Sequence, residues 1–480
     1  MNGLQQTHHD FFYNKQFTEG AGLKGAIDLK TAKLIVKYFN KDIIKEIEHI
    51  KVEDNDLSIN SISCNIKNIN FGILNYSYEK VKINFEPKNK IHISLNGIKG
   101  WGQFSLFFQL LLVNYSDTIS FEINNISVYA TVIIKSKNVG GKLLPDAVIT
   151  TLNYNYDFDF EISSSIGYIV SLFKTPIKNL ITKRLNRLID EEINHGLQIG
   201  LSMIPNEIIV DKKKGYVIDY SLISDPFIEN NFILFNSYAR FINKNIKETQ
   251  NKDNYFRPYS IPSYDLLGKS SQIYISDYVI NTALYTFFKT RDLNILITPD
   301  MLPENLPLIK LNTSWLNMIF KDLSSVYGMD QNVYINLIVC ENPQLILKDK
   351  LISFILPTNI EILVEGFEGI AVKFRTTFFV DAVFKVFENC KISGKIENLN
   401  IKNTQIIWGY TDDENFGSNI ENHFNMLKGL ALPFINMYVL NNMQYPLPVI
   451  RGIKFTDLTI SHHENFINVN YNFQYNENEN

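Results

Sequence analysis

The feature that most constrains the fold is a long stretch in which apolar and polar side chains alternate. It extends from about residue 57 to residue 162 and includes segments such as KIHISLNGI and TISFEINNISVYATVII. Alternation with a period of two is typical of β-strands that bury one face. Asn-Gly at 96–97 and Gly-Gly at 140–141 are turn signals. No helical pattern interrupts the stretch, which therefore predicts an antiparallel meander.

An amphipathic helix is predicted on each side of this meander. Apolar residues recur at spacings of three and four over 22–50 and again from about 164 to 200. Each helix needs a partner for its apolar face, because large apolar patches are rarely left in water. The sheet is the obvious partner, and the helix residues expected to face it include Leu29, Val36, Ile169, Phe173 and Ile177.

The same order of elements occurs a second time. A polar, proline-containing segment at 243–265 precedes a helical pattern at 276–290, alternating strands from about 293 to 409, and a final helical pattern at 418–441. The repeat is one of element order and not of residue identity. The stripes of these two helices include Ile280, Leu284, Phe288, Phe424 and Leu427. Strand-like segments at 205–235 and 449–460 follow the last helix of each repeat, so we expect them to meet in one shared sheet.

Composition and motifs argue against several functions. The chain has 46 basic and 50 acidic residues, which gives no strong field for nucleic acid. Its three cysteines are far apart, without the spacing of a metal site or a disulfide framework. No nucleophile elbow, zinc-protease motif or phosphate-binding glycine loop is found. We therefore expect no catalytic residue, no metal and no cofactor. The N-terminus shows no signal-peptide pattern.

The segment FSLFFQLLLV at 104–113 is the sharpest local oddity, because apolar residues occupy both faces of a predicted strand. At about ten residues it is too short to span a bilayer as a helix. One interpretation is a hydrophobic tip that enters a membrane surface. The alternative is a strand buried on both sides. The residues assigned to the tip are Phe104, Leu106, Phe107, Phe108, Leu110 and Leu111.

Four segments resemble one protein family. They are KEIEHIKVED (45–54), SIGYIVSLFKTPIKNLI (165–181), IYISDYVINTALY (273–285) and YPLPVIRGIKFTDLTISHHENFINVNYNF (445–473). In this order they resemble the family of the bactericidal/permeability-increasing, lipopolysaccharide-binding and plasma lipid-transfer proteins. The resemblance implies an α+β fold: a boomerang of two helix-wrapped antiparallel β-barrels joined by a central β-sheet, with a pseudo-two-fold repeat.

The resemblance also implies a function and a domain plan. It implies a non-enzymatic lipid-binding or lipid-transfer protein with an apolar pocket for phospholipid acyl chains in each barrel. The ten helix residues named above are the candidates for lining these pockets, and plain core packing is the alternative for each of them. Its partners would be a phospholipid or other two-chain lipid and, transiently, a membrane surface. Family habit implies a monomer that is secreted or lies in the secretory-pathway lumen. The expected parts are an N-terminal tail (1–20), the N-terminal barrel (21–204), central-sheet strands (205–242), a linker (243–268), the C-terminal barrel (269–442), central-sheet strands (443–475) and a C-terminal tail (476–480).

Two departures from the family pattern leave alternatives open. The disulfide usual in the N-terminal barrel has no cysteines at VITTLNYN and LIDEEIN. The basic hairpin of lipopolysaccharide-binding members corresponds to WGQFSLFFQLLLV, which has no Lys or Arg. Recognition of a polyanion needs clustered cations. Phospholipid is therefore favoured over a lipopolysaccharide-binding, innate-defence type of function. A structural or adhesion protein with filled pockets is the other alternative.

Overall fold

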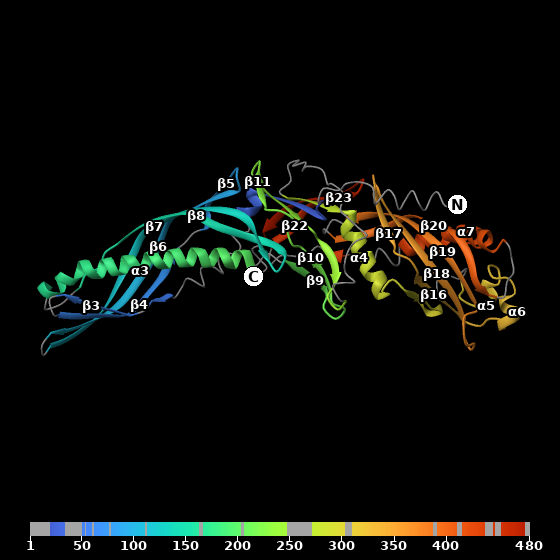
Figure 1. Cartoon of the computed structure of the whole chain (residues 1–480), viewed down its shortest axis with the longest axis horizontal. Helices are drawn as coiled ribbons and strands as arrows, with labels where there is room; N and C mark the ends of the chain where they lie inside the picture. The colour runs from blue at the N-terminus through green and yellow to red at the C-terminus, as the bar shows by residue number, and fades with distance from the viewer. Residues whose placement is uncertain are drawn as a thin grey trace. The chain divides into compact units, whose positions relative to one another are not determined.

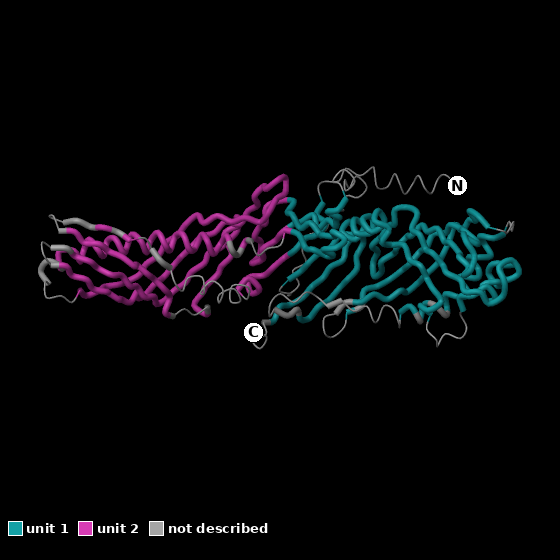
Figure 2. Tube along the Cα trace, turned by 90° about the horizontal axis from the view of Figure 1, so that it is seen from below, with its two compact units in different colours: residues 1–25, 207–223, 236–480 teal, residues 26–206, 224–235 magenta. Residues whose placement is uncertain are grey.

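The computed structural model describes residues 20–33, 50–52, 54–59, 62–75, 78–110, 113–162, 167–202, 206–246, 271–302, 310–386, 391–409, 415–436, 445–446 and 453–475. The chain divides into two compact units, shown in different colours in Figure 2. Unit 1 consists of residues 1–25, 207–223 and 236–480, and unit 2 of residues 26–206 and 224–235. Most of the first predicted helix, residues 34–49, lies outside the described residues.

Unit 2 is built on one antiparallel sheet with the order β2-β4-β6-β7-β8, in which β3 also pairs with β4 and β5 with β6. The predicted meander is therefore confirmed. Its strands are β2 (Ile50–Val52), β3 (Asn55–Ile59), β4 (Ile62–Asn75), β5 (Lys82–Glu86), β6 (Lys90–Leu110), β7 (Val113–Val139) and β8 (Lys142–Phe158). A short 3-10 helix, η1 (Tyr78–Lys80), precedes β5. Strand β1 (Leu23–Asp28) leads into a helical segment at 29–33.

The two glycine signals of this sheet have different outcomes. Gly140 and Gly141 form the β7–β8 turn with φ of 60° and 85°, as predicted. The turn predicted at 96–97 is wrong, because Asn96 and Gly97 lie inside β6 where the register with β7 shifts. Gly97 has a φ of 68°, the conformation that a β-bulge requires of a glycine. A glycine that bends one long strand looks, in sequence, the same as a glycine that ends it.

One long helix, α3 (Gly167–Ser202), covers this sheet (Figure 1). Phe173, Ile177, Ile181 and Leu185 recur every four residues and are buried against the sheet. The prediction of a helix at 164–200 is confirmed. The sheet side of this core is aromatic, with the rings of Phe104, Phe108, Phe121, Phe158 and Phe160.

Unit 1 contains a second antiparallel sheet with the order β15-β16-β18-β19-β20-β21, and β17 pairs with β18. Its strands are β15 (Ile295–Ile297), β16 (Val333–Val339), β17 (Gln344–Lys348), β18 (Leu351–Val364), β19 (Val372–Val386), β20 (Lys391–Gly409) and β21 (Tyr445–Pro446). Its helices are α4 (Asp277–Thr290), η2 (Pro299–Met301), α5 (Thr313–Leu316), α6 (Leu323–Tyr327) and α7 (Phe416–Phe434). A Cβ on Gly417 would lie 2.3 Å from the Thr404 carbonyl oxygen, so glycine lets α7 approach β20 closely. With sheets and helices in both units, the predicted α+β class is confirmed.

The remaining strands of unit 1 form two further groups. Strand β14 (Ser271–Ser276) pairs with β23 (Phe466–Tyr475), which forms a hairpin with β22 (Ile453–His463). Strands β9 (Glu207–Asp211), β10 (Tyr216–Asp219) and β13 (Arg240–Asn243) pair with one another in a separate sheet. In unit 2, β11 (Phe227–Glu229) forms a hairpin around Asn230 and Asn231 with β12 (Phe232–Ser237), of which only the last two residues belong to unit 1. The expected central sheet between the two repeats stays a prediction.

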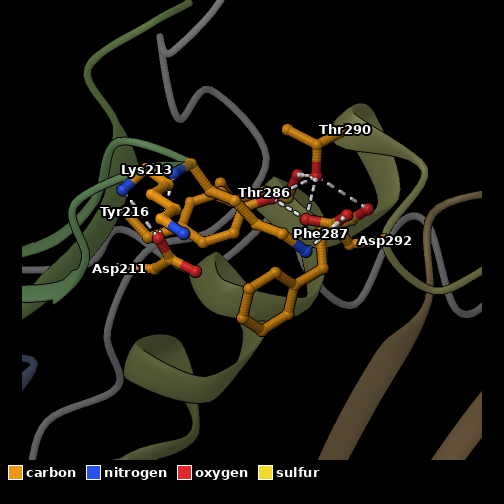
Figure 3. Close-up of polar contacts among 8 residues, drawn as sticks. Asp211, Lys213, Tyr216, Thr286, Phe287, Thr290 and Asp292 are labelled. Atoms are coloured by element: carbon orange, nitrogen blue, oxygen red, sulfur yellow. Dashed lines mark hydrogen bonds and ion pairs between the residues drawn. The ribbon is translucent and has the colours of Figure 1, made fainter.

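A polar cluster holds the β9–β10 hairpin against the end of α4 (Figure 3). The Tyr216 hydroxyl lies 2.6 Å from the Thr290 hydroxyl and donates to the Asp292 carboxylate. Lys214 Nζ lies 3.0 Å from the same carboxylate. These contacts, the tyrosine hydroxyl first and the lysine next, lower the pKa of Asp292. The Tyr216 ring also packs edge-on against Phe287, so the link is both polar and apolar.

Candidate functional site

The five helix residues predicted to face a pocket in unit 2 differ in how far they are buried and in whether the structure describes them. Phe173 and Ile177 are fully buried in the core between α3 and the sheet. Leu29 is half-buried in the segment after β1. Ile169 belongs to α3, but its side chain is not among those described, and Val36 lies outside the described residues. The two buried residues are thus part of a packed core, and their contact with a lipid stays a prediction.

The helix residues predicted for the second pocket divide into two clusters within unit 1. Ile280 and Leu284 of α4 pack on a buried cluster that includes Leu345 and Ile352. Phe424 of α7 packs on a different cluster and meets Phe378 edge-on, with ring centroids 6.0 Å apart. Leu427 is half-buried on α7. Phe288 is half-buried on α4, with Lys289 Nζ 5.7 Å from its ring centroid.

The apolar run from residue 104 is divided between the two faces of β6. Phe104, Leu106 and Phe108 are buried under α3, whereas Phe107 points to the other face and is 40% exposed. Pairing of β6 with β4 and β7 enforces this alternation, because successive side chains of a strand point to opposite faces. Leu110 is the last residue of β6, but its side chain is not among those that the structure describes. Leu111 lies outside the described residues. Of the described tip residues, only Phe107 is available to a membrane.

A second apolar surface in unit 2 continues the core along the sheet. Two rows of paired residues cross β6, β7 and β8, one being Ile93–Ala130–Leu152 and the other Leu95–Val128–Tyr154. We call these six residues the inner strip. Ala130 and Val128, in the middle, are buried, while the four larger flanking residues are half-buried. The flanking apolar side chains of the inner strip are thus partly accessible to solvent. They lie on the face of the sheet that packs against α3 elsewhere.

An aromatic ladder shows that the inner strip lies on the core side of the sheet. The rings of Tyr154, Tyr156, Phe158 and Phe160 stack in succession, with centroids 6.1 to 6.5 Å apart. Phe158 and Phe160 belong to the core under α3. The Tyr156 hydroxyl donates to the Thr182 carbonyl of α3 at 3.2 Å, and burial raises the pKa of Tyr156 to about 12. Burial, followed by the charge of Asp190, also raises the pKa of Tyr154.

The inner strip was not predicted, although the sequence carries a signal for part of it. Residues 151–160 read TLNYNYDFDF, in which large and polar residues alternate strictly. Alternation predicts one buried face, but it does not distinguish a face covered by a helix from one left half-covered. The coverage depends on where α3 lies along the sheet, which is a tertiary property.

The described residues offer little for catalysis or metal binding. Among them, no group of three or more His, Cys, Asp or Glu side chains is placed to hold a metal ion. Cys64 and Cys340 are free thiols, and burial raises the pKa of the Cys64 thiol to about 12, which makes it a poor nucleophile. Within the described part of the chain, none of the helices combines the length and apolarity needed to cross a bilayer.

Comparison with known proteins places this architecture in a family. A family model described as "LBP / BPI / CETP family, C-terminal domain" matches residues 209–475. The chain belongs to the LBP/BPI/CETP family. The match covers more than half of the chain, including the whole second repeat, and it confirms the resemblance inferred from the four segments.

Individual relatives in this family are distant. The chain is 26% identical to lipopolysaccharide-binding protein from Rattus norvegicus over 339 residues, which are 66% of this chain and 64% of that protein. It is 22% identical to lipopolysaccharide-binding protein from Bos taurus over 479 residues, 94% of this chain and 89% of that protein. A crystal structure of lipopolysaccharide binding protein matches 95% of this chain and 99% of that one with 18% identity and a TM-score of 0.48. The match to the rat protein thus spans less than two thirds of its length.

Proposed function

We propose that this LBP/BPI/CETP-family protein binds and transfers phospholipid, holding an acyl chain on the inner strip of unit 2. The observation that carries the proposal is that the strip is apolar, half-buried and continuous with the aromatic core. Relatives named for binding lipopolysaccharide support a lipid ligand in general. We infer that the protein acts without enzymatic chemistry and in a secreted or lumenal setting, as family resemblance implies.

The energetics of an acyl chain set what such a surface must supply. Each methylene removed from water contributes about 0.8 kcal/mol, so a whole chain amounts to roughly 10 kcal/mol. From Leu152 to Phe158 strand β8 advances by about 20 Å, at ~3.3 Å per residue. Along this length, one face of β8 carries the side chains of the inner strip and the aromatic ladder. The other face carries polar side chains. The part of this face at Leu152 and Tyr154 is half-covered and would shield part of a fatty chain, whereas Phe158 lies in the packed core under α3.

Phospholipid is favoured over lipopolysaccharide because of the charge at the end of β6. Residues 101–110 contain no Lys or Arg. Lys67 Nζ lies 5.7 Å from the centroid of the exposed Phe107 ring. A highly phosphorylated lipid would need several cations there, whereas a phospholipid headgroup does not.

Filling the inner strip should weaken lipid uptake. Leu152→Trp places a larger ring on the half-buried side of β8, where it would occupy the space of an acyl chain. We expect roughly tenfold weaker binding of a fluorescent phospholipid, equivalent to about 1.4 kcal/mol. Fluorescence titration measures this affinity, and native mass spectrometry of the purified protein measures the amount of lipid that co-purifies.

The neighbouring residue provides a matched control. Asn153 is exposed on the opposite face of β8, so Asn153→Trp adds the same ring without entering the strip. It should bind lipid like the unmodified protein. The proposal is wrong if the unmodified protein takes up no phospholipid and yields none on extraction. That result would favour a structural or adhesion role. Equal affinities of the two variants would remove the inner strip from the binding surface.

Membrane contact through the β6 tip is a separate prediction. Phe107→Asp should reduce transfer of lipid between vesicles by roughly fivefold, because a charge replaces the exposed ring that would enter the interface. The residue paired with Phe107 on β7 is the exposed Ser116, so Ser116→Asp adds a charge at the same place but keeps the ring. Vesicle flotation and transfer rates should fall mainly for Phe107→Asp. If both variants transfer lipid at the original rate while remaining folded, the tip does not insert.

A further inference from the structure

An open cavity in unit 1 lies apart from the surfaces described so far. It has a volume of about 440 Å³ and is formed by the β18–β19 connection, the end of α6 and one residue of β20. Its lining includes Tyr327, Phe367, Glu368, Ile370, Lys373 and Trp408. We call this site the aromatic pocket. Its volume lies in the range of small-ligand sites, which is about 300–1,000 Å³.

The aromatic pocket faces away from the core of unit 1. Val372 and Phe374 of β19 are buried in that core, so Lys373, between them, points to the opposite face. Trp408 is the β20 partner of Lys373 and shares its face. Val364 and Ala371, which also line the pocket, belong to the buried cluster that Phe424 contacts, so the pocket borders this core on one side and is open on the face of Lys373 and Trp408.

Two of the rings form a corner of the pocket. Tyr327 and Phe367 are nearly perpendicular, at 86°, with centroids 5.3 Å apart. Phe367 is 48% exposed and Trp408 is 56% exposed. Large aromatic residues gathered around an open cavity indicate a binding surface and not ordinary packing. Aromatic faces attract cations because of their negative quadrupole, and tryptophan does so most strongly.

The charges at the pocket also favour a cation. Lys373 Nζ lies 2.9 Å from the Glu361 carboxylate, its partner on β18, so its charge is already compensated. Glu368 is exposed and lines the cavity. Glu365, three residues before it and also exposed, accepts a hydrogen bond from Asn332. Glu368 thus gives the pocket a carboxylate that Lys373 does not neutralise.

We propose that the aromatic pocket binds a quaternary ammonium group, as carried by a choline lipid headgroup or by free choline. Such a group combines a positive charge with an apolar surface of methyl groups, which suits aromatic faces beside a carboxylate. A primary ammonium is more strongly hydrated and needs hydrogen-bond acceptors on several sides. The inference goes beyond the proposed function, because it concerns a headgroup site on a different face and in a different unit from the inner strip.

Free choline tests the site without involving acyl chains. Saturation-transfer difference NMR on the full chain should show a saturable signal from the choline methyl protons, with a Kd on the order of 1 mM. The neutral isostere 3,3-dimethylbutan-1-ol has the same shape without the charge, and ammonium chloride has the charge without the methyl groups. We expect both to bind at least about tenfold more weakly than choline.

Variants distinguish an aromatic cation site from a merely apolar one. Phe367→Leu keeps an apolar side chain but removes the ring, and Trp408→Ala removes the most exposed ring; each should weaken choline binding about tenfold. Glu368→Gln should weaken choline binding and reduce its dependence on salt. As a matched control, Met329→Ala changes an exposed apolar residue near α6 that does not line the pocket. Choline affinity should be unchanged in that variant.

Vesicles identify the source of the group. If a lipid headgroup is the ligand, Trp408→Ala should reduce flotation with phosphatidylcholine vesicles more than with phosphatidylethanolamine vesicles. If both vesicles are unaffected while free choline still binds, the ligand is a soluble cation. The proposal is overturned if the folded protein shows no saturable choline signal. It is also overturned if dimethylbutanol binds as well as choline or if the ring variants bind choline normally. Uptake of phospholipid by unit 2 is measured independently, so failure here leaves the inner strip unaffected.

Discussion

Phe173→Ala should destabilise unit 2 by about 3–5 kcal/mol. Phe173 is fully buried on α3, and its ring meets that of Phe108 edge-on with centroids 5.1 Å apart. Truncation removes both the buried area and an aromatic contact and leaves a cavity between the helix and the sheet. Trp101 is the tryptophan that lies within unit 2. Urea denaturation of a protein with Trp315 and Trp408 replaced by Phe would therefore report the unfolding of this unit.

The preceding residue supplies the control for this experiment. Leu172 is on the same turn of α3 but is 44% exposed, so Leu172→Ala should change the free energy of unfolding by no more than about 0.5 kcal/mol. A small effect of Phe173→Ala, comparable to that of Leu172→Ala, would mean that α3 does not pack tightly on the sheet. It would also remove the argument that the inner strip adjoins a solid core.

The sheets and the later helices could be predicted because their patterns are long and regular. Alternation along most of β6, β7 and β8 has few other physical interpretations, and the spacing of Phe173, Ile177 and Ile181 is helical. Local irregularities within a strand, such as a β-bulge, were harder to predict from the sequence. The Asn-Gly at 96–97 has the composition of a turn, but it forms a bulge because β6 continues to pair with β7 on both sides.

The candidate sites depended on tertiary structure that a single sequence does not carry. The interpretation of Phe104, Leu106 and Phe108 as a membrane tip was based on the number of apolar residues, whereas strand pairing assigns them to the core and leaves Phe107 outside. The aromatic pocket brings together Tyr327, Phe367 and Trp408 from separate segments. Their spacing in the sequence does not indicate that they are neighbours. The pairing of β19 with β20 and the β18–β19 loop bring them together.

Stability should depend on pH through one buried carboxyl group at the start of α4. Asp277 is buried in unit 1, and burial raises its pKa to about 7 from an ordinary value of 3.8. The Ser276 hydroxyl, 3.2 Å from the carboxylate, and the backbone N–H of Tyr278 oppose this shift only in part. In the native chain the group therefore holds its proton at pH values where the unfolded chain has lost it.

The sign of the effect follows from this difference in protons bound. Below pH 4 Asp277 is neutral in both states, and its contribution to stability is at its most favourable. Between about pH 4 and pH 7 the unfolded chain gains free energy by ionising, so native unit 1 loses stability as the pH rises, by up to roughly 4 kcal/mol. Above pH 7 both states are ionised and the loss is complete.

Asp277→Asn removes the ionisation while keeping a side chain of similar size. We expect the variant to become more stable relative to the unmodified protein as the pH rises from 4 to 7, by as much as about 4 kcal/mol in the difference. Urea titrations at four pH values of a protein with Trp101 replaced by Phe, followed through Trp315 and Trp408, measure this difference for unit 1. Asp349→Asn, in the exposed β17–β18 turn, removes a carboxyl group that is not buried and is the matched control. A difference that stays constant with pH for Asp277→Asn would show that the carboxyl group is ionised and solvated in the native protein, in contradiction to its burial beneath the start of α4.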